Sequence, residues 1–445
     1  MSDEKIKITI RAITAKDQDS AKAYHSLKDD ARRKVIKKFN APGYKILTGV
    51  LNAAKKKALS TANKRFLEIA AGPIRTPVYL IDETLIEENM RVMRYVKDRT
   101  GCKMLHALKA YATFATFPVM SRYLDGVCAS GLNEARLGRE EFKKEVHIFG
   151  AAYNDSEIGK IFKYSDSIIF NSFYQLERFG ETAKRAGVEV AMRVNPGHAE
   201  VETEMYNPCA PYSRLGIISE IFQDEFPKYK AMVDGLHFHA MCEQNSDVLE
   251  RVLASFEKLY GPHISGLKWV NFGGGHHITR DGYDIERLIR LINNFRKRYG
   301  VQVYLEPGEA SVLNAGVLIS SVLDIVQNKA QIAIMDTSAE THMPDVLLMP
   351  YRPNIMRSAK PGVKRHTYRI AGPSCLAGDV IGDYSFDNPL KRGDKLVFTD
   401  MALYSIVKNT TFNGINLPDI TVLRKGGQLQ AVKTFGYKDY RNRQS

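Results

Sequence analysis

Eight short apolar runs recur between residues 104 and 305, and each is followed by a polar turn and an amphipathic stretch. They occupy residues 104–108, 126–129, 146–149, 167–170, 188–194, 233–239, 268–272 and 301–305. Eight strands that alternate with helices over roughly two hundred residues are typical of a closed (β/α)8 barrel. A doubly wound α/β sheet has the same local pattern and is the alternative.

Polar residues follow most of these runs directly, and their position favours the barrel. Barrel active sites are built from the carboxyl ends of the strands, so residues that follow the strands meet on one rim. The residues after runs one, two, four, five, six, seven and eight are Lys109, Ser130, Asn171, Arg193 with Asn195, His239, Gly273–Gly275 and Glu306. We therefore predict an α/β fold with an active site at that rim.

The chain outside the barrel divides where the pattern changes. Beyond residue 313, β-rich runs separated by Gly, Pro and Asp turns predict a second, β-rich domain over 314–445. Residues 73–103 form a linking segment with one strand, TPVYLID, and one helix. A closed eight-strand sheet has no place for that strand, so we assign it to the β-rich domain and place the barrel at 104–313.

Residues 1–72 form a basic extension. They contain 17 Lys and Arg against 7 Asp and Glu, whereas the rest of the chain has 47 against 43. The basic runs carry no interleaved aromatic residues of the kind that stack on bases, so we expect no nucleic-acid partner. A solvated, partly helical appendage is our interpretation, and a docking arm for an anionic surface is the alternative.

Composition and the arrangement of the cysteines limit the compartment in which the protein is expected to work. No run approaches the eighteen or so apolar residues of a membrane helix, and the opening MSDEKIKITI has acids where targeting peptides avoid them. We expect a cytoplasmic protein with no membrane partner. The five cysteines are scattered and form no C-x-x-C pair, so the sequence predicts neither a disulfide framework nor a metal site.

Three features of the predicted rim carry chemistry. Lys109 follows a buried strand, where a Schiff base would neutralise its costly charge, although an ordinary solvated rim lysine is the alternative. The triplet Gly273–Gly275 follows strand seven, where barrels often bind phosphate, and a tight turn is the alternative. Glu306 follows strand eight, and a carboxylate there could keep a pyridine nitrogen protonated.

Together these motifs resemble the fold-type III pyridoxal-phosphate decarboxylases, which include ornithine, arginine and diaminopimelate decarboxylases. The resemblance runs from about Thr76 to the last twenty or so residues and leaves the extension out. Its motifs are LHALKAY, VCASGLNEARLG, RVNPG, HFHAMCEQ, NFGGGHHIT, YLEPGEA, GPSCLAGD and MALYSIVKNTTFNG. The segments DTSAETHMPDVL and AGPSCLAGDVIGDY are most similar to the branch of this family that acts on carboxynorspermidine and carboxyspermidine.

The resemblance implies roles for individual residues. Lys109 and Cys375 would be catalytic, Lys109 as the cofactor lysine and Cys375 as the proton donor that reaches a partner's site across a homodimer. Pyridoxal 5'-phosphate would be bound by Lys109 and by the residues Arg193, His239, Gly273, Gly274, Gly275, Glu306 and Tyr404. Amino groups of a polyamine substrate would be bound by Glu309, Asp336, Asp379 and Glu243, for which exposed turn acids are the alternative.

Departures from the family pattern narrow the substrate. Most relatives have arginine where this chain has Glu309, and an acid where it has Leu376. A glutamate disfavours a substrate with a distal carboxylate and favours a distal amine. The resemblance therefore implies decarboxylation of a carboxylated triamine. Decarboxylation of diaminopimelate, ornithine or arginine, and a non-catalytic regulatory role, are the alternatives.

Overall fold

The structure is a computed structural model that describes residues 9, 12–13, 20–37 and 41–445. The chain divides into two compact units, which are described separately. The first unit comprises residues 1–55, 88–109 and 117–311, and the second comprises residues 56–87, 110–116 and 312–445. What the sequence suggested for residues 1–8, 10–11, 14–19 and 38–40 lies outside the described residues.

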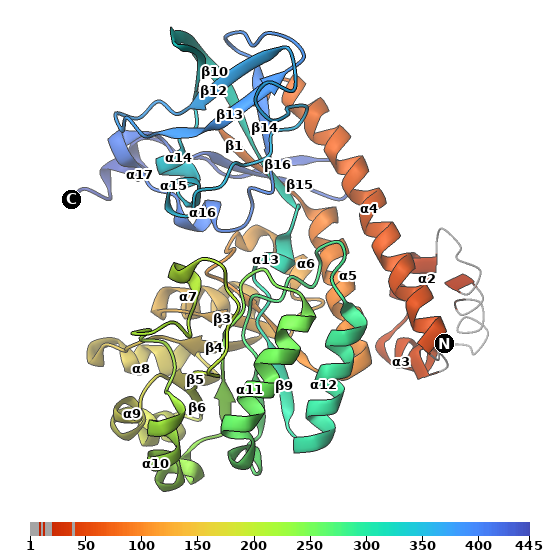
Figure 1. Ribbon diagram of the computed structural model, residues 1–445, viewed down its shortest axis with the longest axis vertical. Coiled ribbons are helices and arrows are strands. Elements are labelled where there is room, and N and C mark those ends of the chain that lie inside the picture. Colours follow the sequence, from red (N-terminus) through yellow and green to blue (C-terminus); the bar gives the residue numbers. More distant parts are fainter. Residues whose placement is uncertain (1–8, 10–11, 14–19, 38–40) are drawn as a thin grey trace. The chain divides into compact units, whose positions relative to one another are not determined.

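The first unit contains a closed barrel of eight parallel strands, which confirms the predicted fold (Figure 1). Each strand pairs with the next in sequence, and the barrel closes where Met104 pairs with Leu305. Its centre is filled by Leu105, Ile169, Ala191, Trp269 and Tyr304, which form one buried cluster. The strands are β2 (Lys103–Ala107), β3 (Gly126–Ala129), β4 (Glu145–Phe149), β5 (Ser167–Phe170), β6 (Glu189–Arg193), β7 (Gly235–His237), β8 (Trp269–Asn271) and β9 (Gln302–Leu305).

Helices connect these strands, and α12 shows why such segments are helical. It buries Ile285, Leu288, Ile289, Ile292 and Phe295, which recur every three or four residues on one face. Among the described residues, no helix is both long and apolar enough to cross a membrane. The helices are α2 (Ser20–His25), α3 (Asp29–Lys37), α5 (Glu83–Thr100), α6 (Phe117–Met120), α7 (Leu132–Leu137), α8 (Asp155–Tyr164), α9 (Phe173–Arg185), α10 (Ser219–Tyr229), α11 (Ser246–Ile264), α12 (Ile285–Tyr299) and α13 (Glu309–Val312).

The second unit is built on a mixed eight-stranded sheet of order β13-β12-β11-β10-β1-β15-β16, with β14 paired to β10. The strand that the sequence excluded from the barrel, β1, pairs with β10 on one side and β15 on the other. Strands β13, β15 and β16 were not predicted. The strands are β1 (Val78–Asp82), β10 (Gly316–Asn328), β11 (Ala330–Met335), β12 (His366–Ala371), β13 (Val380–Phe386), β14 (Lys395–Thr399), β15 (Asp419–Leu423) and β16 (Leu429–Lys433).

Short helices join the strands of this unit. They lie between β11 and β12, after β14, and at the end of the chain. Tyr404, which the sequence assigned to the site, directly precedes one of them. They are α14 (Ala339–His342), α15 (Asp345–Leu348), α16 (Ser405–Lys408) and α17 (Tyr437–Arg441).

The basic extension contains a long packed helix, α4 (Ala41–Ala71), that begins in the first unit and ends in the second. Its side chains Leu47 and Leu51 are buried in the first unit, and Phe66 is buried in the second. Thr48 of α4 donates to Oε1 of Glu286 on α12 over 3.1 Å. The expectation of a solvated appendage is therefore wrong for this helix, because its charged positions concealed an apolar face.

Candidate active site

The carboxylate of Glu306 lies at the mouth of the barrel, directly after β9, and two neighbouring strands hold it. Asn271, the last residue of β8, donates from Nδ2 to Oε1 over 2.8 Å. His237, the last residue of β7, lies with Nε2 3.3 Å from Oε2. Burial opposes the ionisation of Glu306, but electrostatic attraction and the hydrogen bond from His237, with contributions from His239 and Lys109, lower its pKa well below the usual value. This acid is therefore ionised at neutral pH.

The glycine triplet after β8 needs all three glycines. Gly273 and Gly275 have φ of 70° and 80°, where other residues are strained. A Cβ on Gly274 would lie 2.7 Å from the carbonyl oxygen of Glu306, and one on Gly275 would lie 2.0 Å from that of Met241. At the triplet, the main chain therefore lies very close to the main chain that follows β7 and β9. A single tight turn would not require this.

His239 and Arg193 lie beside this loop. The N–H of Gly274 donates to Nδ1 of His239 over 2.9 Å, so the proton of the neutral imidazole resides on Nε2. Burial, with the charges of Lys109 and Arg193, lowers the pKa of His239 well below its usual value. The Arg193 guanidinium lies 4.4 Å from the ring centre of Phe149 and donates to the carbonyl of His239 over 3.4 Å. A neutral imidazole is the form suited to stacking on an aromatic ring.

Lys109 follows β2 and is exposed in the same barrel mouth. Its charge contributes to the lowered pKa of Glu306 and opposes the rise that burial causes in the pKa of Glu134, so both carboxylates are within electrostatic reach of the amine. The main chain beside it is fixed, since the N–H of Leu108 donates to the carbonyl of Cys128 on the next strand. The structure therefore brings Lys109, His239, Glu306, Arg193 and the glycine triplet to one rim of the first unit.

These residues fit pyridoxal phosphate. Lys109 supplies an amine for covalent attachment, and Glu306 supplies an ionised carboxylate, which a protonated ring nitrogen requires. The main chain at Gly273–Gly275 has no room for side chains, which suits a loop that a phosphate approaches closely. The donor set combines a nucleophile, an anion and an anion-binding loop, and that combination matches the chemical groups of this cofactor.

Cys375 and Tyr404 lie in the second unit. Cys375 is exposed in the loop between β12 and β13, and its N–H donates to Oδ1 of Asn413 over 2.7 Å. Tyr404 precedes α16 with φ of 49°, and its N–H donates to the carbonyl of Ala110, the residue after Lys109 in the chain. Both segments are therefore fixed by specific main-chain bonds, and Asn413 is a loop anchor that the sequence did not reveal.

The four acids assigned to the substrate have different surroundings. Asp379 is 3% exposed and accepts main-chain N–H groups of Ala339 and Ser374. Asp336 is half-buried, and its oxygens accept from the side chains of Thr76 and Ser320 and the main chain of Ser321. Buried main-chain bonds give Asp379 a structural role, whereas Asp336 keeps accessible surface.

Glu309 and Glu243 belong to the first unit and lie near Lys109. Burial and the charges of these two acids raise the pKa of Cys242 to about 12, while Lys109 opposes that shift. Both carboxylates and the Lys109 amine are therefore within electrostatic reach of one thiol. Glu309 begins α13, and Glu243 is exposed with φ of 52°. These two acids join the barrel-mouth site.

Sequence reasoning missed His237 and Asn271. Each lies two residues before a predicted site residue, His239 and Gly273, and alternate residues of a strand point to the same face. A polar residue within an apolar strand, two positions before a site residue, was the available signal. Its meaning depends on strand neighbours, because His237 pairs with Asn271 in the sheet and both face Glu306.

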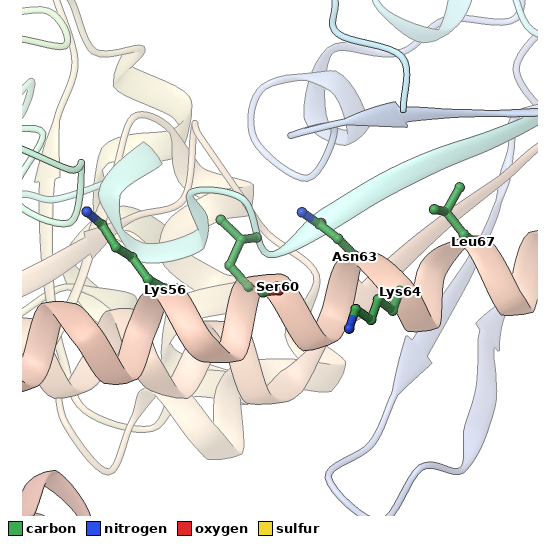
Figure 2. Close-up of a pocket in the computed structure, with 6 residues that line it drawn as sticks. Lys56, Ser60, Asn63, Lys64 and Leu67 are labelled. Atoms are coloured by element: carbon green, nitrogen blue, oxygen red, sulfur yellow. The ribbon is translucent and has the colours of Figure 1, made fainter. Parts of the chain in front are cut away.

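A pocket on helix α4 is a separate feature. It is lined by Lys56, Leu59, Ser60, Asn63, Lys64 and Leu67, and the labelled side chains project from one helix (Figure 2). The predicted catalytic and cofactor-binding residues are not among those lining residues. The geometry of the barrel mouth therefore locates the candidate site, and this surface depression does not.

The chain resembles proteins of one enzyme family. The family described as "Pyridoxal-dependent decarboxylase, C-terminal sheet domain" matches residues 43–402. Carboxynorspermidine/carboxyspermidine decarboxylase of Campylobacter jejuni is 43% identical over 82% of this chain and 98% of that relative. Carboxyaminopropylagmatine decarboxylase of Synechocystis is 39% identical over 83% of this chain and 95% of that protein.

A solved structure agrees with these similarities. The crystal structure of Campylobacter jejuni carboxynorspermidine decarboxylase complexed with norspermidine has a TM-score of 0.77 and 42% sequence identity. The match covers 83% of this chain and 100% of that one. This chain therefore carries residues beyond those shared with the neighbour.

Proposed function

Because the chain belongs to the pyridoxal-dependent decarboxylases, a family of carboxy-lyases that use pyridoxal phosphate, we propose that it decarboxylates carboxynorspermidine or carboxyspermidine to norspermidine or spermidine. The observation that carries this proposal is the ionised Glu306 held in one barrel mouth with Lys109, the glycine triplet and two further acids. The relatives named for carboxylated triamines support the choice of substrate.

The first-unit residues divide the work of holding the cofactor. Lys109 would attach it covalently and yield it to the substrate amine, while Gly273–Gly275 would bind its phosphate. His239 would face the ring, with Arg193 bound to its main-chain carbonyl, and Glu306 would keep the ring nitrogen protonated. When bound, this cofactor supplies an electron sink for the charge that departing CO₂ leaves on the α-carbon.

Cys375 is the proposed source of the proton that the α-carbon then receives. We propose a homodimer with shared sites, in which the cysteine acts in the site of a second copy of the chain. Its exposure and the anchoring of its loop by Asn413 support a residue that must reach outward without moving freely.

The substrate amines are proposed to meet Glu309, Glu243 and Asp336. Glu309, Glu243 and Lys109 all act electrostatically on Cys242, and Asp336 keeps part of its surface accessible. Anionic side chains favour a chain that ends in ammonium groups and disfavour one that ends in a carboxylate. We leave Asp379 out of this set because buried main-chain donors occupy it.

The cytoplasm is the proposed location. The five cysteines of the structure are all free thiols. Proteins exposed to oxidising compartments tend to pair their cysteines, whereas reducing compartments keep thiols free. The free thiols are consistent with a reducing compartment.

The test is a decarboxylation assay of the purified protein. Carboxynorspermidine and carboxyspermidine should be turned over with kcat/KM at least about tenfold above ornithine, arginine and diaminopimelate, a difference of about 1.4 kcal/mol. A higher kcat/KM on carboxyaminopropylagmatine would mean that the substrate is this guanidino analogue and not the carboxylated triamine. Preference for diaminopimelate would overturn the assignment of the acids.

A second measurement separates an enzyme from a regulatory homologue. The protein should absorb in the near-visible and bleach with borohydride, and Lys109→Ala should lose both the absorbance and turnover. Lys103, which lies on β2 and pairs with Glu145, provides a matched lysine control that should keep the absorbance when changed to alanine. Near-normal activity in Lys109→Ala would exclude Lys109 as the cofactor lysine.

A further inference from the structure

Two buried polar side chains and the partly buried carboxylate of Glu306 lie at the ends of adjacent strands at the barrel mouth. His237 ends β7, Asn271 ends β8, and Glu306 follows β9. Each oxygen of the carboxylate has its own partner, with Oε1 at 2.8 Å from Asn271 and Oε2 at 3.3 Å from His237. Asn271 is fully buried and His237 is 2% exposed. The carboxylate is therefore gripped at both oxygens.

The orientation of the Asn271 amide follows from its second bond. Its Oδ1 accepts the main-chain N–H of Gly273 over 2.9 Å, so its Nδ2 must face Glu306. A carboxylate accepts and an N–H donates, so the reversed amide would lose both bonds. One side chain thus links Glu306 to the first glycine of the triplet. A second link joins them, since the N–H of Glu306 donates to the carbonyl of Gly273 over 2.8 Å.

The His237 imidazole is also fixed. Its ring stacks on Phe149 with centroids 5.8 Å apart and an angle of 19° between planes. Burial lowers the pKa of His237, while Glu306 opposes that shift. A neutral imidazole can present one N–H, and the carboxylate at Nε2 requires that N–H to be there. The ring therefore has one productive tautomer and one productive orientation.

We infer that His237 and Asn271 are positioning residues for Glu306, and that Asn271 couples the carboxylate to the glycine triplet so that both ends of the cofactor are located by one amide. Neither residue touches the reacting atoms. Their effect is to present an ionised carboxylate in a fixed place, where a mobile one would have to be ordered at each turnover. The inference rests on the proposed role of Glu306 at the ring nitrogen and is independent of the choice of polyamine.

An amide suits this position better than an acid would. An aspartate of the same shape could still accept the N–H of Gly273, but it would place a second carboxylate against Glu306. Two carboxylates in hydrogen-bond contact cannot both ionise freely, so one would hold a proton. Asn271→Asp therefore tests the charge of the pair while leaving the link to the main chain intact.

The readout is the ring nitrogen itself. We would load the protein with ¹⁵N-labelled pyridoxal phosphate and record the ring-nitrogen chemical shift from pH 6 to 9. The wild type should show a protonated nitrogen throughout. His237→Leu should lose ring protonation at the alkaline end of this range, whereas His237→Gln, which keeps a donor at the Nε2 position, should restore it. Asn271→Asp should change the pH range over which the ring nitrogen is protonated, because a second ionisable carboxylate then lies against Glu306. The exposed Asn294→Ala on α12 is the matched control.

Cofactor affinity tests the coupling. Asn271→Ala, Glu306→Gln and the double variant would be compared by equilibrium binding of pyridoxal phosphate. Each single change should weaken binding about tenfold, and the double variant should lose clearly less than the product of the two, since both break one network. Multiplicative losses would overturn the coupling. If Asn271→Ala does not fold by circular dichroism, the isosteric Asn271→Asp replaces it in the cycle.

The outcomes separate the inference from its premise. If Glu306→Gln leaves the ring nitrogen protonated over the whole range, then the proposed role of Glu306 fails. If Glu306→Gln changes the signal while His237→Leu and Asn271→Asp keep the wild-type signal, the positioning role alone is overturned. If both kinds of variant change the signal and His237→Gln restores it, the inference is supported.

Discussion

The carboxylate of Asp379 accepts the main-chain N–H of Ala339 over 2.7 Å at the start of α14. Its other oxygen accepts the N–H of Ser374, the residue before Cys375, over 3.1 Å. The close packing extends to Gly372, where an added Cβ would lie 2.2 Å from the same carboxylate. One buried acid therefore ties the loop of the proposed proton donor to a helix of its own unit.

The first prediction concerns that acid. Asp379→Asn should lower the free energy of unfolding by about 1–3 kcal/mol, because main-chain donors would lose a charged acceptor in a buried place. Urea denaturation would measure the loss. Asp387→Asn is the matched control, since Asp387 is 72% exposed in a surface pair with Lys364 and should change stability little. If Asp379→Asn left the free energy of unfolding unchanged but raised KM, Asp379 would be a substrate-binding residue instead.

A second prediction concerns the proposed substrate acids. Glu309→Gln, Glu243→Gln and Asp336→Asn should each raise KM for a carboxylated triamine, with a loss of about 1–3 kcal/mol where a charged hydrogen bond is removed. Their effects on kcat should be smaller, since none of these acids is assigned a role in chemistry. Steady-state kinetics would measure both constants. Unchanged kinetics in all three variants would mean that the polyamine binds elsewhere.

The third prediction is a pH dependence of stability centred on His342. Its Nε2 donates to the carbonyl of Asn416 over 3.1 Å, and the N–H of Ser338 donates to its Nδ1 over 3.3 Å. Burial lowers the pKa of His342 from 6.5 to about 4, with Asp379 and the Asn416 bond opposing. Between pH 6.5 and pH 4, His342 therefore binds a proton in the unfolded chain but not in the folded chain. The free energy of unfolding consequently falls as the pH drops from 6.5 toward 4.

Urea denaturation at pH 7.5 and 5.0 would measure this effect. At about 1.4 kcal/mol per pH unit, His342 accounts for roughly 2 kcal/mol of the wild-type difference. His342→Gln should reduce the difference by that amount but not abolish it, because burial also lowers the pKa values of His276 and His277 to about 4. An equal pH difference in variant and wild type would show that His342 titrates normally in the folded protein.

The fourth prediction tests the packed helix of the extension. Leu51→Ala should destabilise the protein by about 2–5 kcal/mol, since Leu51 is 3% exposed on α4 and its removal leaves a cavity. Lys57→Ala, an exposed change on the same helix, is the control and should have little effect. Thermal melting would compare them. Equal stability of the two variants would contradict the packing of α4 and would support the interpretation of a solvated appendage.

The sequence was sufficient to predict the barrel and to place the candidate site residues at one of its rims. The strand and helix periods are local properties, and the residues directly after each strand, such as Lys109 and Glu306, must lie at the carboxyl ends. The grip of His237 and Asn271 on Glu306 could not be predicted, because it depends on the register of three strands and on side-chain direction. The same limit applies to Asn413 and Cys375, which are 38 residues apart in the chain.

Strand β13 and the packing of helix α4 are two features that sequence analysis did not predict. The strand β13 contains Gly382 and Asp383, residue types that are depleted in strands, yet it pairs along its length with β12. In helix α4, the lysines, including the run Lys55–Lys57, obscured the spaced apolar positions of Leu47, Leu51 and Phe66. In both cases tertiary packing overrides the local preference.

The last prediction concerns shared sites in a dimer. Lys109 belongs to the first unit and Cys375 to the second, and we propose that each site combines Lys109 of one chain with Cys375 of the other. Neither Lys109→Ala nor Cys375→Ala alone should decarboxylate well. A mixture of the two should contain mixed dimers in which one of the two sites is wholly wild type, because a two-fold arrangement places both changes in the other site.

Random exchange at equal amounts makes half of the dimers mixed, and each has one intact site of two, so recovery of up to about a quarter of normal activity is expected. Exchange must be confirmed separately, for example by mass spectrometry of differently tagged chains, because unexchanged homodimers would also give no recovery. Two chains that both carry Cys375→Ala provide the control and should recover nothing on mixing. If exchange is complete and activity does not rise, Cys375 acts within its own chain or takes no part in the reaction.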